Sequence, residues 1–168
     1  MNAEELREIQ FPLKTKYKEE PDTAMIILKA QARLTDGISC RVETGKALVT
    51  AGLHPATGGN GLAVCSGDML LEALAACAGV TLNAVATAIG IELKDAVVRT
   101  EGDLDFRGTL GVSKEAPVGF SGIRVFFDLD TTADHEKIAK LIELTERYCV
   151  VLQTLKNSPK LAISSSVS

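Results

Sequence analysis

The stretch LLEALAACAGVTL, residues 70–82, is almost entirely small or apolar and carries one cysteine, Cys77, near its middle. Its apolar residues run nearly all the way around a helical turn, a pattern typical of a helix buried on most of its sides. Small residues such as Ala75 and Gly79 would let a neighbouring backbone pack closely against it. The stretch therefore predicts a buried central helix. Cys77 within it is either a small apolar packing residue or a nucleophile kept away from water.

The predicted helix has sequence signals at both ends. Ser66 or Asp68 could cap its N-terminus, and Gly90 is a suitable terminator. Residues 69–91 are long enough to cross a lipid bilayer, but Glu72 and several other polar residues interrupt the apolar sequence. We expect a buried helix rather than a membrane span, and therefore no membrane partner.

Strict alternation of apolar and polar residues predicts half-buried strands on both sides of this helix. In the segment after it, Val98, Thr100, Leu104 and Phe106 share one face, and charged residues share the other. The order of strands and helices predicts an α+β fold with helices packed on an antiparallel sheet. The expected strands are residues 23–33, 38–45, 94–108, 119–130 and, near the C-terminus, 160–167.

A second helix is expected over residues 132–156, where apolar residues recur at helical spacing. Thr131 and Asp134 offer a weak capping box at its start. Cys149 follows Ile142 by seven residues, so it lies on the apolar side of this helix.

Residues 52–68 are rich in glycine and predict a long loop, a kind of segment that is often functional in compact domains. The GGNG sequence at 58–61 lacks the lysine and the spacing of a phosphate-binding loop, so it predicts a flexible turn. His54 is interpreted as an ordinary loop residue. We divide the chain into an N-terminal lead-in, residues 1–22, and one domain, residues 23–168.

Composition narrows the range of functions. The chain has 168 residues and a net charge of −4, without a basic stripe, which disfavours nucleic-acid binding. The four cysteines of the chain form no closely spaced pair, so a zinc site is not expected. No secretory signal is visible in the acidic, polar N-terminal segment, so we expect a cytosolic protein. A cysteine pair that oxidises in the cytosol is more often catalytic or redox-sensing than structural. Cys40 and Cys65 are interpreted as structural.

Two stretches in this order carry a resemblance to a known family. They are SGDMLLEALAACAGVTLNAV at 66–85 and ERYCVVLQTLKNSP at 146–159, the latter preceded by the strand VGFSGIRVFFDLD. Together they resemble the OsmC/Ohr superfamily, the osmotically inducible and organic-hydroperoxide-resistance proteins. That family has a cysteine midway along a central helix and a Cys-Pro-Val-like motif on a later helix. The motif here is Cys149-Val150-Val151, without the proline.

The resemblance covers roughly residues 23–167 and implies an OsmC-like fold: antiparallel sheets, two main helices including the buried central one, and an intertwined homodimer. It also implies a thiol peroxidase. Cys77 would be the peroxidatic cysteine that attacks an organic hydroperoxide, and Cys149 the resolving cysteine. An external dithiol would reduce the resulting disulfide, with no metal, flavin or haem as cofactor.

This chemistry requires a thiolate, whereas the pKa of a free cysteine thiol is about 8.5, so only a minority is ionised at neutral pH. Cys77 lies about 13 Å from the helix start, too far for the helix dipole to activate it. In the hydroperoxide reductases the activating cation is an arginine held by a glutamate nine or ten residues before the cysteine. Asp68 is the nearest match to that glutamate, and Arg33, Arg41 and His54 are candidate cations. The alternative function is an OsmC-fold binding or structural module with little peroxidase activity.

Overall fold

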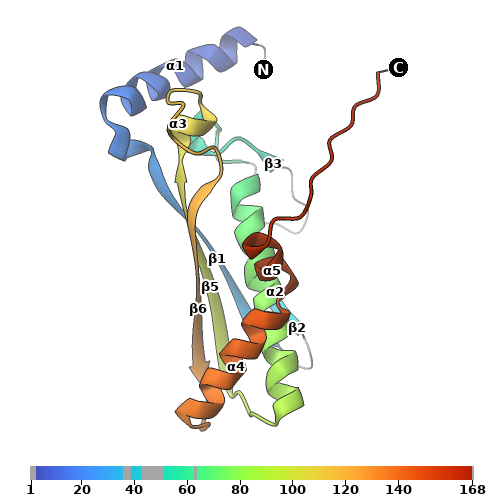
Figure 1. Ribbon diagram of the computed structural model, residues 1–168. Coiled ribbons are helices and arrows are strands. Elements are labelled where there is room, and N and C mark those ends of the chain that lie inside the picture. Colours follow the sequence, from blue (N-terminus) through green and yellow to red (C-terminus); the bar gives the residue numbers. More distant parts are fainter. Residues whose placement is uncertain (1–2, 36–38, 43–50, 63, 168) are drawn as a thin grey trace.

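The computed structural model describes residues 3–35, 39–42, 51–62 and 64–167. A four-stranded antiparallel sheet forms one layer, and helices packed on one of its faces form the other (Figure 1). The elements in chain order are α1 (Ala3–Glu19), η1 (Pro21–Ala24), β1 (Met25–Thr35), β2 (Ser39–Val42), β3 (Ala51–Gly52), η2 (Pro55–Thr57), β4 (Val64–Cys65), α2 (Ser66–Ile89), β5 (Asp95–Asp105), α3 (Phe106–Thr109), β6 (Phe120–Asp130), α4 (His135–Tyr148) and α5 (Val150–Lys156).

The sheet has the strand order β2-β1-β5-β6, and β3 and β4 form a separate parallel pair. On the central strand β5, Thr100 pairs with Ala30 of β1 and with Val125 of β6. These ladders confirm the expected α+β class and four of the expected strands. Residue 38 and residues 43–45 of the second expected strand lie outside the described residues.

The two faces of the sheet differ as the alternation predicted. On the inner face Val98 and Thr100 are fully buried, and the Thr100 hydroxyl donates to the backbone oxygen of Leu71 in α2 at 3.0 Å. The outer face carries ion pairs such as Arg99–Asp128 at 2.8 Å. The inner face therefore forms the core together with α2, and the outer face faces water.

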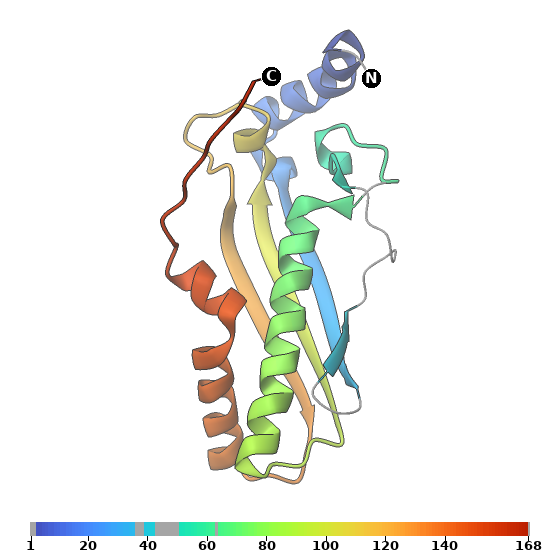
Figure 2. The ribbon, with the colours of Figure 1, turned by 90° about the vertical axis from the view of Figure 1, so that its right-hand side faces the viewer.

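Helix α2 runs along the sheet beside α4 and α5 (Figure 2). It ends at Gly90, whose left-handed φ of 71° confirms the predicted terminator. Its N-cap is Cys65, which makes no side-chain capping hydrogen bond, so the prediction of Ser66 or Asp68 as the cap was wrong. In the described part of the chain, α2 is the one helix long and apolar enough to cross a membrane. Its buried side packs on the sheet as the core helix of the domain.

The second expected helix, residues 132–156, was wrong as a single element because the chain breaks into α4 and α5 at Cys149. The N-cap of α4 is Asp134, whose carboxylate accepts from the backbone N–H of Lys137 at 2.8 Å. Thr131 does not cap the helix. Its hydroxyl instead donates to the backbone oxygen of Glu92, which ties the end of β6 to the turn after α2.

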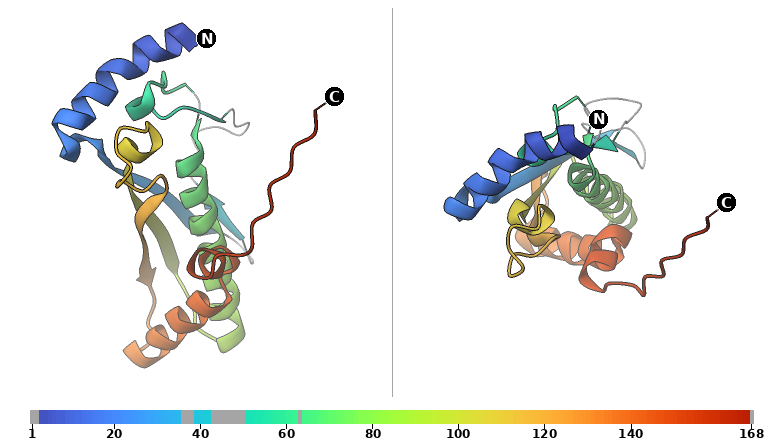
Figure 3. Two further views of the ribbon diagram at one scale, coloured as in Figure 1. Left: turned by 45° about the horizontal axis from the view of Figure 1, so that its top comes forward. Right: turned by 90° about the horizontal axis from the view of Figure 1, so that it is seen from above.

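Two expected strands also differ from the structure. Residues 160–167 form no ladder, and this exposed segment extends away from the body (Figure 3). The strand expected over 94–108 stops at Asp105, because the Asp105 carboxylate accepts from the backbone N–H of Arg107 and caps the short helix α3. Phe106 consequently lies in α3 and is buried there rather than on the strand.

The N-terminal lead-in contains the 17-residue helix α1. It packs over the loop before α2: Tyr17 donates to the backbone oxygen of Ala56 at 2.7 Å, and Gln10 donates to that of Thr57 at 3.3 Å. Helix α1 therefore holds the η2 turn in place.

Candidate active site

Cys77 lies about halfway along α2 and is partly buried. It packs against a core cluster built from α2, the inner face of the sheet and α4, with Leu74, Ala78, Val98 and Leu141 among its buried members. Cys77 therefore faces the core that α2 shares with the sheet and α4. It also keeps some exposure to solvent.

Cys149 is fully buried in the same cluster, at the junction of α4 and α5. Its ψ of 105° is extended rather than helical, which ends α4 and lets α5 start in a new direction. Its backbone N–H still donates to Thr145 and its oxygen still accepts from Gln153, both at 2.9 Å. The junction therefore loses no hydrogen bond at Cys149, and the bend directs α5 across α2.

The two thiols lie within interaction range of one another. The pKa of Cys149 is raised to about 11, chiefly by burial and further by the neighbouring Cys77 side chain. The backbone N–H groups of Leu152 and Val151 act in the opposite direction but do not offset burial. Cys149 is therefore a neutral thiol at physiological pH, next to a more accessible thiol. The structure brings together the two cysteines that the sequence singled out.

An apolar groove of about 520 Å³ runs between β6 and α5. Neither cysteine lines it, but Leu152 and Leu155 on its α5 side both pack against the cluster that contains the two thiols. At its edge Lys156 pairs with Glu146 of α4. The groove is open and mostly apolar, so it suits an alkyl or aryl group better than a charged one.

Asp68 does not lie beside Cys77 in this chain. Asp68 is in the first turn of α2, about 13 Å along the helix axis from Cys77. Burial raises its pKa, and nearby His54 acts against that rise. Arg33 pairs with Asp95 at 2.5 Å, and the side chain of Arg41 lies outside the described part. The structure thus brings Asp68 near His54, and no hydrogen bond or ion pair within the described residues joins Cys77 to a basic side chain.

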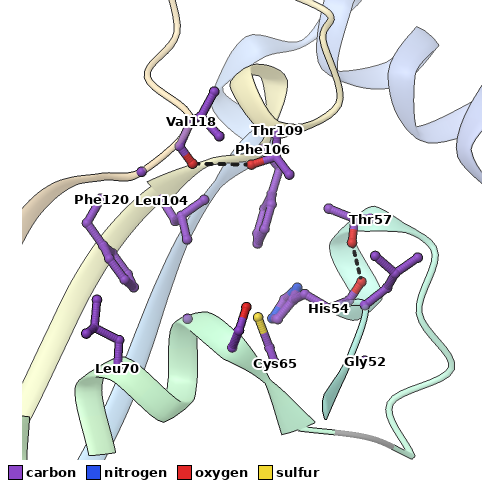
Figure 4. A pocket seen from close by; sticks show the side chains of 14 residues that line it. Gly52, His54, Thr57, Cys65, Leu70, Leu104, Phe106, Thr109, Val118 and Phe120 are labelled. Carbon is purple, nitrogen blue, oxygen red and sulfur yellow. Dashed lines mark hydrogen bonds between the residues drawn. The ribbon is translucent and has the colours of Figure 1, made fainter. Parts of the chain in front are cut away.

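A second cavity, of about 380 Å³, lies at the N-terminal end of α2 and was not anticipated (Figure 4). Cys65 and His54, interpreted from sequence as a structural and a loop residue, both line it. The only signal for it was the length and glycine content of the loop at residues 52–68. Among the described residues no group of three or more His, Cys, Asp or Glu side chains is arranged to hold a metal ion.

Comparisons with known proteins agree with this architecture. A family model described as "OsmC-like protein" matches residues 58–164, more than half of the chain. One similar solved structure is an OsmC-like hydroperoxide resistance protein from Jannaschia sp. CCS1, with 18% identity, a TM-score of 0.59, and coverage of 86% of this chain and 95% of that one. Another is an OsmC-like protein from Mycoplasma pneumoniae, with 17% identity, a TM-score of 0.56, and coverage of 80% and 86%. No curated protein matches the chain in sequence.

Proposed function

Because the chain belongs to the family of OsmC-like proteins, we propose that it is a thiol-dependent peroxidase that reduces organic hydroperoxides through Cys77 and Cys149. The observation that carries this proposal is the pairing of a partly exposed thiol with a fully buried one in a single apolar cluster. One of the structurally similar proteins is itself described as a hydroperoxide resistance protein.

The unequal environments of the two thiols support different roles for them. A peroxidatic cysteine must meet its substrate and lose its proton, whereas a resolving cysteine needs only to reach the product sulfur. Cys77 is the more accessible of the two. Cys149 is fully buried with its pKa raised to about 11, so it stays protonated until the sulfenic acid forms beside it.

The reaction uses only these thiols and the peroxide. The Cys77 thiolate attacks the terminal oxygen of ROOH, the O–O bond breaks, and RO⁻ takes up a proton and leaves as the alcohol. The Cys149 sulfur then attacks the sulfur of the Cys77 sulfenic acid, water leaves, and a disulfide forms. An external dithiol reduces the disulfide and restores both thiols. We propose no metal, flavin or haem cofactor.

The substrate class follows from the apolar groove beside α5. Its lining of Phe120, Ile123, Val125 and three leucines would bury an alkyl or aryl group and gain hydrophobic free energy from it. Hydrogen peroxide has no such group. We therefore propose organic hydroperoxides as the preferred substrates.

The proposed active form is an intertwined homodimer in the cytosol. The side of α2 that faces away from the sheet exposes Met69 and Val80, each 37% accessible. A central helix with an apolar exposed side suits burial against a second copy of itself. We propose no nucleic-acid or membrane partner.

A second candidate function, an OsmC-fold binding module with little turnover, is favoured by one observation. No basic side chain in the described part of the chain forms a hydrogen bond or ion pair with Cys77, and a peroxidatic thiolate is normally stabilised by a nearby cation. In an assembled homodimer, the partner subunit could supply that group.

The proposal predicts that, with excess dithiothreitol, the protein consumes cumene hydroperoxide about tenfold or more faster than hydrogen peroxide. Leu155→Ser, which makes the groove polar, should reduce this preference. Leu161→Ser, the same change on a side chain that is 85% exposed outside the groove, should leave it unchanged. Consumption of both peroxides at the rate of dithiothreitol alone would favour the binding module instead.

A further inference from the structure

The cavity at the N-terminal end of α2 combines a nucleophilic side chain with a fixed hydrogen-bonding ring. Its walls come from the loop before α2, the first turn of α2, the end of β5 with α3, and the start of β6. In Figure 4 the Cys65 sulfur and the His54 imidazole both point into this space, beneath Phe106. Cys65 lies twelve residues before Cys77, or about 18 Å along α2, so the two thiols belong to separate sites.

His54 is held from three directions. Its ring stacks on Phe106 with centroids 4.9 Å apart, and its Nδ1 accepts from the backbone N–H of Ala56 at 3.0 Å. Its backbone oxygen accepts from the Thr57 hydroxyl at 2.9 Å. Since Nδ1 is an acceptor, the hydrogen of the neutral ring is on Nε2, which is left to donate. Tyr17 of α1, bonded to the Ala56 oxygen, holds the same turn from outside.

Cys65 is free to react. It forms no disulfide, and although it occupies the N-cap position of α2, its side chain makes no capping hydrogen bond. It is partly buried, so a molecule that reaches the cavity meets the sulfur away from bulk water.

The lining determines which molecules fit. Leu70, Leu104, Phe106 and Phe120 form apolar walls, and the residues described as lining the cavity include no lysine, arginine, aspartate or glutamate. An anionic ligand would therefore find no counter-charge there. A neutral molecule with an apolar chain and one hydrogen-bond acceptor would bury the chain and accept from His54.

We propose that this cavity is a second thiol site, in which Cys65 adds to apolar α,β-unsaturated aldehydes. The sulfur attacks the β-carbon as its proton passes to solvent, and the carbon–carbon π bond breaks. Negative charge moves onto the carbonyl oxygen, which accepts from His54 Nε2–H. A proton from solvent then adds to the α-carbon and restores the aldehyde. The adduct forms without an oxidant, a reductant or a leaving group, and independently of Cys77 and Cys149.

The experiment treats the reduced full-length protein with trans-2-nonenal and measures adduct formation at each cysteine by peptide mass spectrometry. Cys65 should react about tenfold or more faster than N-acetylcysteine. The ratio of the Cys65 rate to the N-acetylcysteine rate should rise from acrolein to 2-hexenal to 2-nonenal, because the longer chains fill the apolar cavity. Saturated nonanal should give no stable thioether. These comparisons use the unaltered protein and do not depend on the folding of a variant.

Two variants test His54. His54→Asn keeps an oxygen acceptor for the Ala56 N–H, and His54→Phe keeps an aromatic ring against Phe106; both remove the Nε2 donor. Each should lower the Cys65 rate by about tenfold and leave peroxide consumption through Cys77 unchanged. Three results would each overturn the proposal. Cys65 could react with trans-2-nonenal no faster than N-acetylcysteine does, its rate could be independent of the length of the aldehyde chain, or both variants could react at the wild-type rate.

Discussion

Replacing Cys77 with serine will lower the consumption of cumene hydroperoxide by about a thousandfold or more, because it removes the nucleophile that breaks the O–O bond. Serine is close to cysteine in size, so the packing of α2 against the cluster with Leu74 and Leu141 is preserved. The matched control is Cys65→Ser at the N-cap of the same helix, which should retain wild-type turnover. The measurement is peroxide consumption with excess dithiol, and retained activity in Cys77→Ser would remove Cys77 from the mechanism.

Cys149→Ser separates the two thiol roles. Its first reaction with peroxide should proceed normally, because Cys77 is intact, but the resulting sulfenic acid should persist and be trapped by dimedone. Cys77→Ser should give no dimedone adduct at this site. If Cys149→Ser loses the first reaction as well, the assignment of attacking and resolving thiols is wrong.

Burial of Cys149 also makes the folded protein less stable at high pH. The pKa of this thiol is raised from an ordinary value near 9 to about 11, so the folded state holds a proton that the unfolded state loses between these values. Its contribution is therefore complete below about pH 9 and falls as the pH rises towards 11. The two-unit shift corresponds to roughly 2–3 kcal/mol of unfolding free energy.

The test compares urea unfolding of the wild type and Cys149→Ala from pH 8 to pH 11. Both proteins lose stability as tyrosines and lysines titrate, so the difference between them isolates the thiol. That difference should shrink steadily above pH 9. A constant difference across this range would mean that the Cys149 thiol ionises as freely in the folded protein as in the unfolded one.

Periodicity predicted the elements whose environment is uniform along their length. The alternation around Val98 and Thr100 reflects a sheet with one face buried and one wet, and the small apolar residues of α2 reflect burial on the sheet and beside α4. The α+β class, the placement of Cys77 on a central helix and the burial of Cys149 in the same core could therefore be predicted from the sequence alone.

The remaining features depend on contacts between distant segments. Apolar residues continue at helical spacing past Cys149, so the break between α4 and α5 has no local signal; it follows from the packing of α5 across α2. The proximity of Cys65 and His54 depends on how α1 and α3 hold the loop between them. Alternation at residues 160–167 suggested a strand, but alternation cannot supply a partner for its backbone.

The pairing of Cys77 with Cys149 is tested most directly by treating the reduced wild-type protein with one equivalent of cumene hydroperoxide and mapping its disulfides by mass spectrometry. The account predicts that one intramolecular Cys77–Cys149 bond accounts for nearly all of the oxidised protein, and that dithiothreitol reverses it. Oxidation of Cys40 or Cys65 without a Cys77–Cys149 bond would contradict the account.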